Sequence, residues 1–259
     1  IMDTNVVSVT TQEDRELVAQ AFNRYGFIAI PVVDGENRLV GIVTFDDAIG
    51  VMEEEATEDI EKMAAITPTD KPYMRTGVFD LWKARIPWLL LLMVSATFTG
   101  MIITSFEDAL AAYVVLTAFI PMLMDTGGNS GSQASVTVIR SLSLGEVGFS
   151  DLFAVLWKEL RVALFCGVTL AAANFVKMML FDRLVLGNTG ITPVVALVIS
   201  LTLICTVVCA KAVGCTLPLL AKKLGFDPAV MASPFITTIV DAISLLIYFQ
   251  FAKLFLHLA

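Results

Sequence analysis

Long apolar segments fill the last two thirds of this chain, and they restrict its possible folds more than any other feature. The hydrocarbon core of a bilayer is about 30 Å thick, so a helix needs about 20 apolar residues to cross it. The chain is 57% hydrophobic, whereas soluble domains are about 45–50% apolar. The sequence therefore predicts an α-helical membrane protein with five transmembrane helices in residues 86–259. The spans are expected at residues 86–104, 110–124, within 153–180, from 193 to about 220, and from about 229 to 256.

The net negative charge of the chain lies entirely in its first third. Residues 1–85 hold 16 of the 25 acidic residues and eight of the 17 basic ones, whereas residues 86–259 hold nine of each. An acidic surface repels the phosphates of nucleic acids, so we expect no nucleic-acid partner. The same charge favours cations, although an ordinary solvated acidic surface remains the alternative.

Basic residues are unevenly distributed around the predicted spans, and such residues collect on the cytosolic side of a membrane. With five spans, ten basic residues lie on the side of the membrane that holds the N-terminal domain, either in a connection between spans or next to one. Lys211 is one of these ten, because we assign it to the flank of the connection between the fourth and fifth spans. Only Lys177, Arg183 and Lys253 lie on the other side. We therefore expect a multi-pass protein of the cell inner (plasma) membrane, with the N-terminal domain in the cytosol and the C-terminus outside.

The first 52 residues have the pattern of a small α/β domain. Residues 6–9 and 28–33 are rich in β-branched and apolar residues and predict strands, with a helix over 14–25 between them. Turn residues at 34–37 precede a third strand at 39–44, and a second helix begins at Phe45. The order is β-α-β-β-α.

This segment resembles a CBS domain. The resemblance is carried by Val6-Val7-Ser8-Val9, by Pro31-Val32-Val33-Asp34, and by the run from Leu39 to Thr44 with Asp46-Asp47. CBS domains work in pairs, so the resemblance implies that residues 1–52 are the second of a pair and that the chain begins inside a longer protein. It also implies possible binding of an adenosine nucleotide, with Thr44 and Asp47 facing the ribose. A purely structural module is the alternative.

Six acidic residues follow within nine positions, at the start of a connecting segment over residues 53–85. They are Glu53, Glu54, Glu55, Glu58, Asp59 and Glu61, and no basic residue lies among them. Like charges one turn apart destabilise a helix, and a bound Mg²⁺ or Ca²⁺ would reverse that effect because hard cations take carboxylate oxygens. Glu54, Glu58 and Asp59, with Asp46 and Asp47, are therefore candidate regulatory metal ligands. A solvated linker is the alternative.

Glycines interrupt the predicted second span. Residues 125–133 read Asp-Thr-Gly-Gly-Asn-Ser-Gly-Ser-Gln, and we expect the helix to break there and to resume at residues 134–142. Irregular backbone at membrane depth is tolerated only inside protein or beside water. Gly127, Gly128 and Asn129 are thus candidate pore-lining residues, although glycines also permit close helix contact.

Asp241 lies near the middle of the last predicted span. Ser233, Thr237, Asp241, Ser244 and Tyr248 recur at helical spacing and form one polar stripe on an apolar helix. A charge at mid-bilayer costs about 2.5–3.5 kcal/mol on insertion scales, so such a residue usually marks a pathway. Ser233, Thr237 and Ser244 are candidate pore-lining residues beside it. A protonated aspartic acid hydrogen-bonded between helices is the alternative.

The whole chain resembles the MgtE family of magnesium channels. The specific stretches run from Pro121 to Gln133 and from Asp227-Pro228 through Pro234 to Asp241. The resemblance implies a homodimer with Mg²⁺ as its ion, a pore between the subunits, Asp241 as the residue that meets hydrated Mg²⁺, and Asn129 near the pathway. It also implies that the acidic segment is a gating helix, where cytosolic Mg²⁺ bridges carboxylates and closes the pore. Other divalent cations are possible cargo.

Three further functions compete with a channel. An exchanger on the same scaffold would couple Mg²⁺ to a counter-ion, and a nucleotide-sensing regulator would use its spans as a membrane anchor. An intramembrane protease would need Asp125 and Asp241 to share a proton, but Asp125 lies at the glycine-rich segment, so we expect no enzyme. Cys166, Cys205, Cys209 and Cys215 all lie in apolar stretches and are expected to be packing residues.

Overall fold

The structure is a computed structural model that describes every residue except 1–5, 70, 232 and 258–259. For Ser233 it describes the backbone but not the side chain. The chain forms two compact units, and the boundary between them falls between Glu61 and Lys62. Each unit has its own hydrophobic core.

The first unit is a three-stranded sheet with two helices. The elements are β1 (Val9–Thr10), α1 (Arg15–Tyr25), β2 (Ala29–Val33), β3 (Leu39–Thr44) and α2 (Phe45–Met63). The strand order is β1-β2-β3, with β1 parallel to β2 and β2 antiparallel to β3. The β-α-β-β-α order predicted from the sequence is confirmed, but the first strand begins at Val9 rather than at Val6.

Local sequence explains the ends of these elements. Asp14 caps α1 by accepting a hydrogen bond from the Glu16 backbone N–H at 2.8 Å. Gly26 ends the helix with a φ of 65°, a conformation that costs glycine no steric strain. The core between the sheet and the helices is formed by Val9, Phe22, Ile30 and Ala48.

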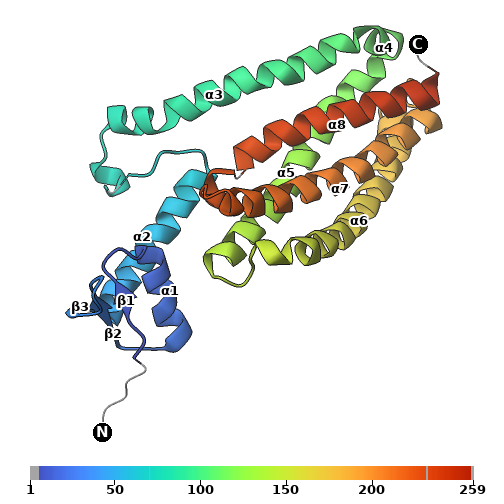
Figure 1. The fold of residues 1–259 in the computed structure, drawn as a ribbon. Helices are drawn as coiled ribbons and strands as arrows, with labels where there is room; N and C mark the ends of the chain where they lie inside the picture. The colour runs from blue at the N-terminus through green and yellow to red at the C-terminus, as the bar shows by residue number, and fades with distance from the viewer. Residues whose placement is uncertain (1–5, 70, 232, 258–259) are drawn as a thin grey trace. The chain divides into compact units, whose positions relative to one another are not determined.

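The second unit is helical (Figure 1). After a 3₁₀ turn at Tyr73–Arg75, its long helices are α3 (Val78–Ser105), α5 (Ile120–Ser143), α6 (Leu152–Lys177), α7 (Pro193–Lys223) and α8 (Ser233–Leu256). Shorter pieces are α4 (Glu107–Ala112), 3₁₀ turns at Val114–Phe119, Phe149–Asp151 and Pro228–Met231, and a π-helical stretch at Met178–Val185. Helix α7 packs against α5, α6 and α8 and is the most buried of the set.

Four helices in the described part of the chain are long and apolar enough to cross a membrane. They cover Val78–Ser105, Phe149–Val185, Pro193–Lys223 and Pro228–Leu256. Helix α5 is a fifth long helix, but its polar residues keep it outside this set. The first of the four begins at Val78, eight residues before the predicted span, and those eight residues include the charged residues Asp80, Lys83 and Arg85.

The predicted second span is wrong in both its bounds and its break. The backbone is irregular between Ala112 and Ile120, inside the span expected at 110–124. Helix α5 then runs without interruption through residues 125–133, where the break was expected. Glycine disfavours a helix by only about 1 kcal/mol, and tight packing of these glycines offsets that cost.

Gly127, Gly128 and Gly131 face the neighbouring helices at very short range. A Cβ at Gly127 would lie 2.8 Å from Thr206 Cγ2 of α7 and 2.9 Å from Ser244 Oγ of α8, and one at Gly128 would lie 2.8 Å from Thr237 Cγ2. On α7, a Cβ at Gly214 would lie 2.2 Å from the Gly131 carbonyl oxygen. Small residues thus allow α5, α7 and α8 to approach closely, as in many membrane helix pairs.

Candidate functional site

The polar stripe of α8 faces α5 rather than lipid. Thr237 contacts α5 at Gly128, and Ser244 contacts it at Gly127. The Tyr248 hydroxyl donates a hydrogen bond to the Leu116 carbonyl at 2.9 Å, and Ser244 donates one to the Val240 carbonyl at 2.7 Å. The backbone of Ser233 begins α8, but its side chain lies outside the described residues. The stripe therefore points into the helical unit, as its sequence predicted.

Asp241 is the half-buried carboxylate within this stripe. Its Oδ1 atom is buried and has no hydrogen-bond partner among the described residues. Asp125 of α5 lies close enough to act on it electrostatically. A buried acceptor without a donor is costly, so Asp241 has an oxygen available for a ligand or for water.

Helix α5 carries a second polar stripe on its uncovered face. Asp125, Asn129, Gln133 and Thr137 follow one another at four-residue intervals, and all four are exposed. Gly127 and Gly128 lie on the opposite, buried face, where their placement fits close helix contact, and their lining of a pore stays a prediction. The four-residue spacing of amide, carboxylate and hydroxyl groups was readable in the sequence, but we expected a broken helix there and considered Asp125 only as a protease residue.

A cavity of about 510 Å³ opens beside the α5 stripe. Asp125, Asn129 and Gln133 line it from α5, while Cys166 and Thr169 line it from α6, and Lys211 lines it from α7. Lys211 is 5% exposed and lies inside α7. Its placement in the flank of a connection was therefore wrong, because the apolar helix continues for 12 residues beyond it to Lys223.

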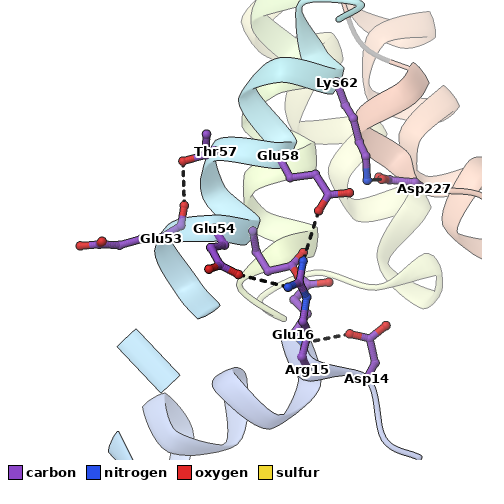
Figure 2. Close-up of polar contacts among 10 residues, drawn as sticks. Asp14, Arg15, Glu16, Glu53, Glu54, Thr57, Glu58, Lys62 and Asp227 are labelled. Carbon is purple, nitrogen blue, oxygen red and sulfur yellow. Dashed lines mark hydrogen bonds and ion pairs between the residues drawn. The ribbon is translucent and has the colours of Figure 1, made fainter. Parts of the chain in front are cut away.

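The acidic segment is part of α2, which runs through the expected boundary at residue 52. Arg15 of α1 binds three of its carboxylates, and its Nε lies 2.6 Å from Glu55 Oε1. Its Nη1 lies 3.1 Å from Glu54 Oε2 and its Nη2 lies 3.6 Å from Glu58 Oε2 (Figure 2). Partial burial raises the pKa of Glu55, and the Arg15 charge opposes that rise. Residues 53–61 contain no basic residue, but the fold places Arg15 against their carboxylates.

The remaining regulatory candidates do not converge on one point. Asp46 and Asp47 lie in the first turn of α2, where the helix dipole favours acidic groups. Glu54, Glu58 and Asp59 lie two to three turns further on. Among the described residues, no group of three or more His, Cys, Asp or Glu side chains could hold a metal ion. Metal binding by these carboxylates stays a prediction.

Thr44 and Asp47, the expected ribose contacts, are paired with one another. The Thr44 hydroxyl donates a hydrogen bond to Asp47 Oδ2 at 2.8 Å, across the start of α2. A cavity of about 250 Å³ in the same unit is lined by Val9, Thr10, Glu13 and Arg15 among others, and by neither Thr44 nor Asp47. Nucleotide binding at these two residues stays a prediction.

An ion pair connects residues of the second unit that lie far apart in sequence. Lys62 Nζ lies 2.5 Å from Asp227 Oδ2 (Figure 2). Asp227 Oδ1 also accepts a hydrogen bond from the Ala229 backbone N–H at 2.8 Å, so its side chain begins the 3₁₀ turn that precedes α8. Lys62, directly after the acidic residues, is thereby attached to the loop before the helix that carries Asp241.

Comparison with known proteins identifies two families that match this chain. The model of the MgtE family, described as a divalent cation transporter, matches residues 120–251, and the model of the CBS domain matches residues 1–54. The match to the MgtE model covers α5 to α8, which contain both polar stripes and the cavity.

Curated relatives match almost the whole chain. The chain is 41% identical to the magnesium transporter MgtE of Thermus thermophilus and 38% identical to that of Bacillus subtilis, in each case over 99% of this chain and 55% of the relative. The magnesium transporter MgtE of Enterococcus faecalis is 32% identical over 99% of this chain and 54% of its own length. The chain spans about half the length of the curated relatives it matches. From the family-model match and the full-chain similarity together, this chain is a member of the MgtE family of divalent cation transporters.

Proposed function

We propose that this chain forms a membrane pathway for divalent cations, with Mg²⁺ as cargo, between two copies of itself. One observation carries the proposal: Asp125, Asn129, Gln133 and Thr137 form an exposed polar stripe on α5, close to a half-buried Asp241. Transport of an ion is not an enzymatic reaction, so none of these residues is assigned a catalytic role.

The exposed stripe on α5 supports the homodimer. Carboxylates and amides at membrane depth face protein or water, because hydrocarbon does not solvate them. A second copy related by a two-fold axis would place two such stripes opposite each other, and the space between them would hold water. Helix α5 would then cross the membrane as the fifth span, shielded from lipid on its polar side.

The chemistry of the stripes suits a hydrated cation. Mg²⁺ loses its water reluctantly and is usually held by one or two carboxylates through retained waters. Asp241 offers an oxygen that has no partner among the residues the structure describes, and Asn129 and Gln133 offer amide groups that can hydrogen-bond the water shell. A pair of Asp241 side chains, one from each copy, would supply the carboxylates.

A flux assay with the chain in liposomes tests the proposal. We expect entry of Mg²⁺ down its gradient, and we expect the rate to be unaffected by gradients of Na⁺ or H⁺. Flux that requires such a counter-ion gradient would instead establish an exchanger on the same scaffold. The absence of flux in both cases, from protein that is folded in the membrane, would contradict the proposed pathway.

We further propose that cytosolic Mg²⁺ closes the pathway by binding the carboxylates of α2. The support is their density and their strong attraction for a cation, which Arg15 partly satisfies in this structure. A state of the protein that binds Mg²⁺ better becomes favoured as its concentration rises. The N-terminal unit would then lie in the cytosol, and the protein in the cell inner membrane.

Neutralising Glu54→Gln, Glu58→Gln and Asp59→Asn together is expected to remove the inhibition of flux by Mg²⁺ on the N-terminal side. The physical reason is that three of the carboxylates that attract the cation lose their charge. Flux is measured while Mg²⁺ on that side is raised. The matched control is the double variant Glu36→Gln and Asp34→Asn, which removes charge from the β2–β3 turn of the same unit. Inhibition that survives in the triple variant would contradict this mechanism.

A further inference from the structure

The cavity beside α5 contains a charged group that the proposed cation pathway does not use. The Lys211 side chain is 6% exposed, and among the described residues it makes one ion pair, 3.4 Å from Glu159 Oε2 of α6. An ammonium group has three donors, one long contact uses one of them, and Lys211 lines the cavity. A buried positive charge therefore faces a space that also contains a carboxylate.

The packing of α5 against α7 shows where this charge lies along the stripe. A Cβ at Gly127 would meet Thr206, whereas one at Gly131 would lie 3.2 Å from the Ala210 carbonyl oxygen. The two helices thus run in the same direction, and Lys211 lies at the level of Gly131. Asp125 lies six residues earlier on α5, at the other end of the cavity. Within the described lining, Asp125 and Lys211 are the two charged residues.

A cation in this cavity experiences both charges. Asp125 attracts it and Lys211 repels it, and each interaction is twice as strong for a divalent ion as for a monovalent ion. Glu159 is itself largely buried, with its side chain 15% exposed, and it partly cancels the Lys211 charge. The balance matters because an ion that is to pass must bind well enough to enter and weakly enough to leave.

We propose that Lys211, held by Glu159, is an affinity-determining residue that limits how tightly the cavity binds a divalent cation. The inference rests on the proposed pathway and deepens it. Lys211 weakens the hold of Asp125 on the ion and so speeds its release, while Glu159 keeps the repulsion from excluding the ion. The pair therefore sets the concentration at which the pathway saturates.

The test uses three variants in the same Mg²⁺ flux assay with the chain in liposomes. Lys211→Met removes the positive charge and keeps the apolar stem, so we expect the apparent KM for Mg²⁺ to fall about tenfold and the maximal flux to fall with it, because release slows. Glu159→Gln leaves the Lys211 charge uncancelled, so the apparent KM rises by a similar factor. Lys211→Arg keeps the charge and restores the KM of the parent chain.

The opposite directions of the two KM shifts distinguish this role from a structural one. A purely structural ion pair predicts that Lys211→Met and Glu159→Gln both lower the yield of folded protein and leave the KM of the remainder unchanged, and that result would overturn the inference. Thermal stability of each variant in detergent separates folding from transport. If all three variants kept the KM of the parent chain while replacement of Asp241 still abolished flux, the role of Lys211 would be refuted but the pathway would not. Absence of flux from the folded parent chain would refute the pathway itself.

Discussion

Replacing Asp241 with asparagine is expected to reduce Mg²⁺ flux about 100-fold or more while leaving the protein folded. Asparagine keeps the size of the side chain but removes its charge, and losing one partner of a buried charged contact costs about 2–5 kcal/mol. The Oδ1 atom of Asp241 has no partner within the described residues, so the substitution breaks no hydrogen bond of that atom. Flux of Mg²⁺ into liposomes measures the effect.

Two further variants, one of them a control, define the expected pattern of Mg²⁺ flux. Asp80→Asn removes a carboxylate at the start of α3, where its side chain is 55% exposed, and should leave flux unchanged. Asp125→Asn removes the neighbouring carboxylate from the exposed stripe and should raise the apparent KM without abolishing flux. If Asp241→Asn carried Mg²⁺ at the rate of the parent chain, the pathway would not pass this residue.

Replacing Gly214 with alanine is expected to destabilise the helical unit by about 3 kcal/mol or more. The added methyl group would lie 2.2 Å from the Gly131 carbonyl oxygen and 3.1 Å from its Cα. These are backbone atoms and cannot rotate away, so α5 and α7 have to separate, and overpacking of this kind commonly costs about 1–3 kcal/mol even where side chains can yield. The thermal midpoint in detergent should fall by about 10 °C.

Gly100→Ala is the matched control for this substitution. Gly100 lies in α3, and a Cβ there would meet no described atom within 4 Å. Because alanine favours a helix over glycine by about 1 kcal/mol, the control should be neutral or slightly stabilising. An equal effect of the two substitutions would show that close approach of α5 and α7 does not matter for stability.

Local patterns in the sequence were sufficient to predict much of the secondary structure of this molecule. Hydrophobicity located helices α3, α6, α7 and α8 in the sequence. Turn and cap residues such as Asp14 and Gly26 located the elements of the first unit. The periodicity of α8 also indicated that Thr237, Asp241, Ser244 and Tyr248 share one face. These features depend on residues within one or two turns of each other, so a linear reading captures them.

Contacts between distant segments were not predictable in the same way. The glycines at 127, 128 and 131 read as a helix break, because their partners Thr206, Thr237, Ser244 and Ala210 are known only once the helices are packed. Arg15 is 39 residues from Glu54 in the sequence, and Lys211 is 52 from Glu159. Which basic group neutralises which carboxylate depends on how the elements cross.

The placement of Asp241 depends both on local sequence pattern and on contacts between distant segments. By itself, the sequence determined that a carboxylate lies in the middle of a membrane-length helix, because hydrophobicity and helical period are local properties. Only the tertiary structure decided that this carboxylate lies close to Asp125, beside an uncovered polar stripe on α5 and a cavity with a buried lysine at its other end. The proximity of the two carboxylates depends on the close approach of α5 and α8 at Gly127 and Gly128, and the place of the lysine depends on that of α5 and α7 at Gly131 and Gly214. No pattern within one helix specifies either approach.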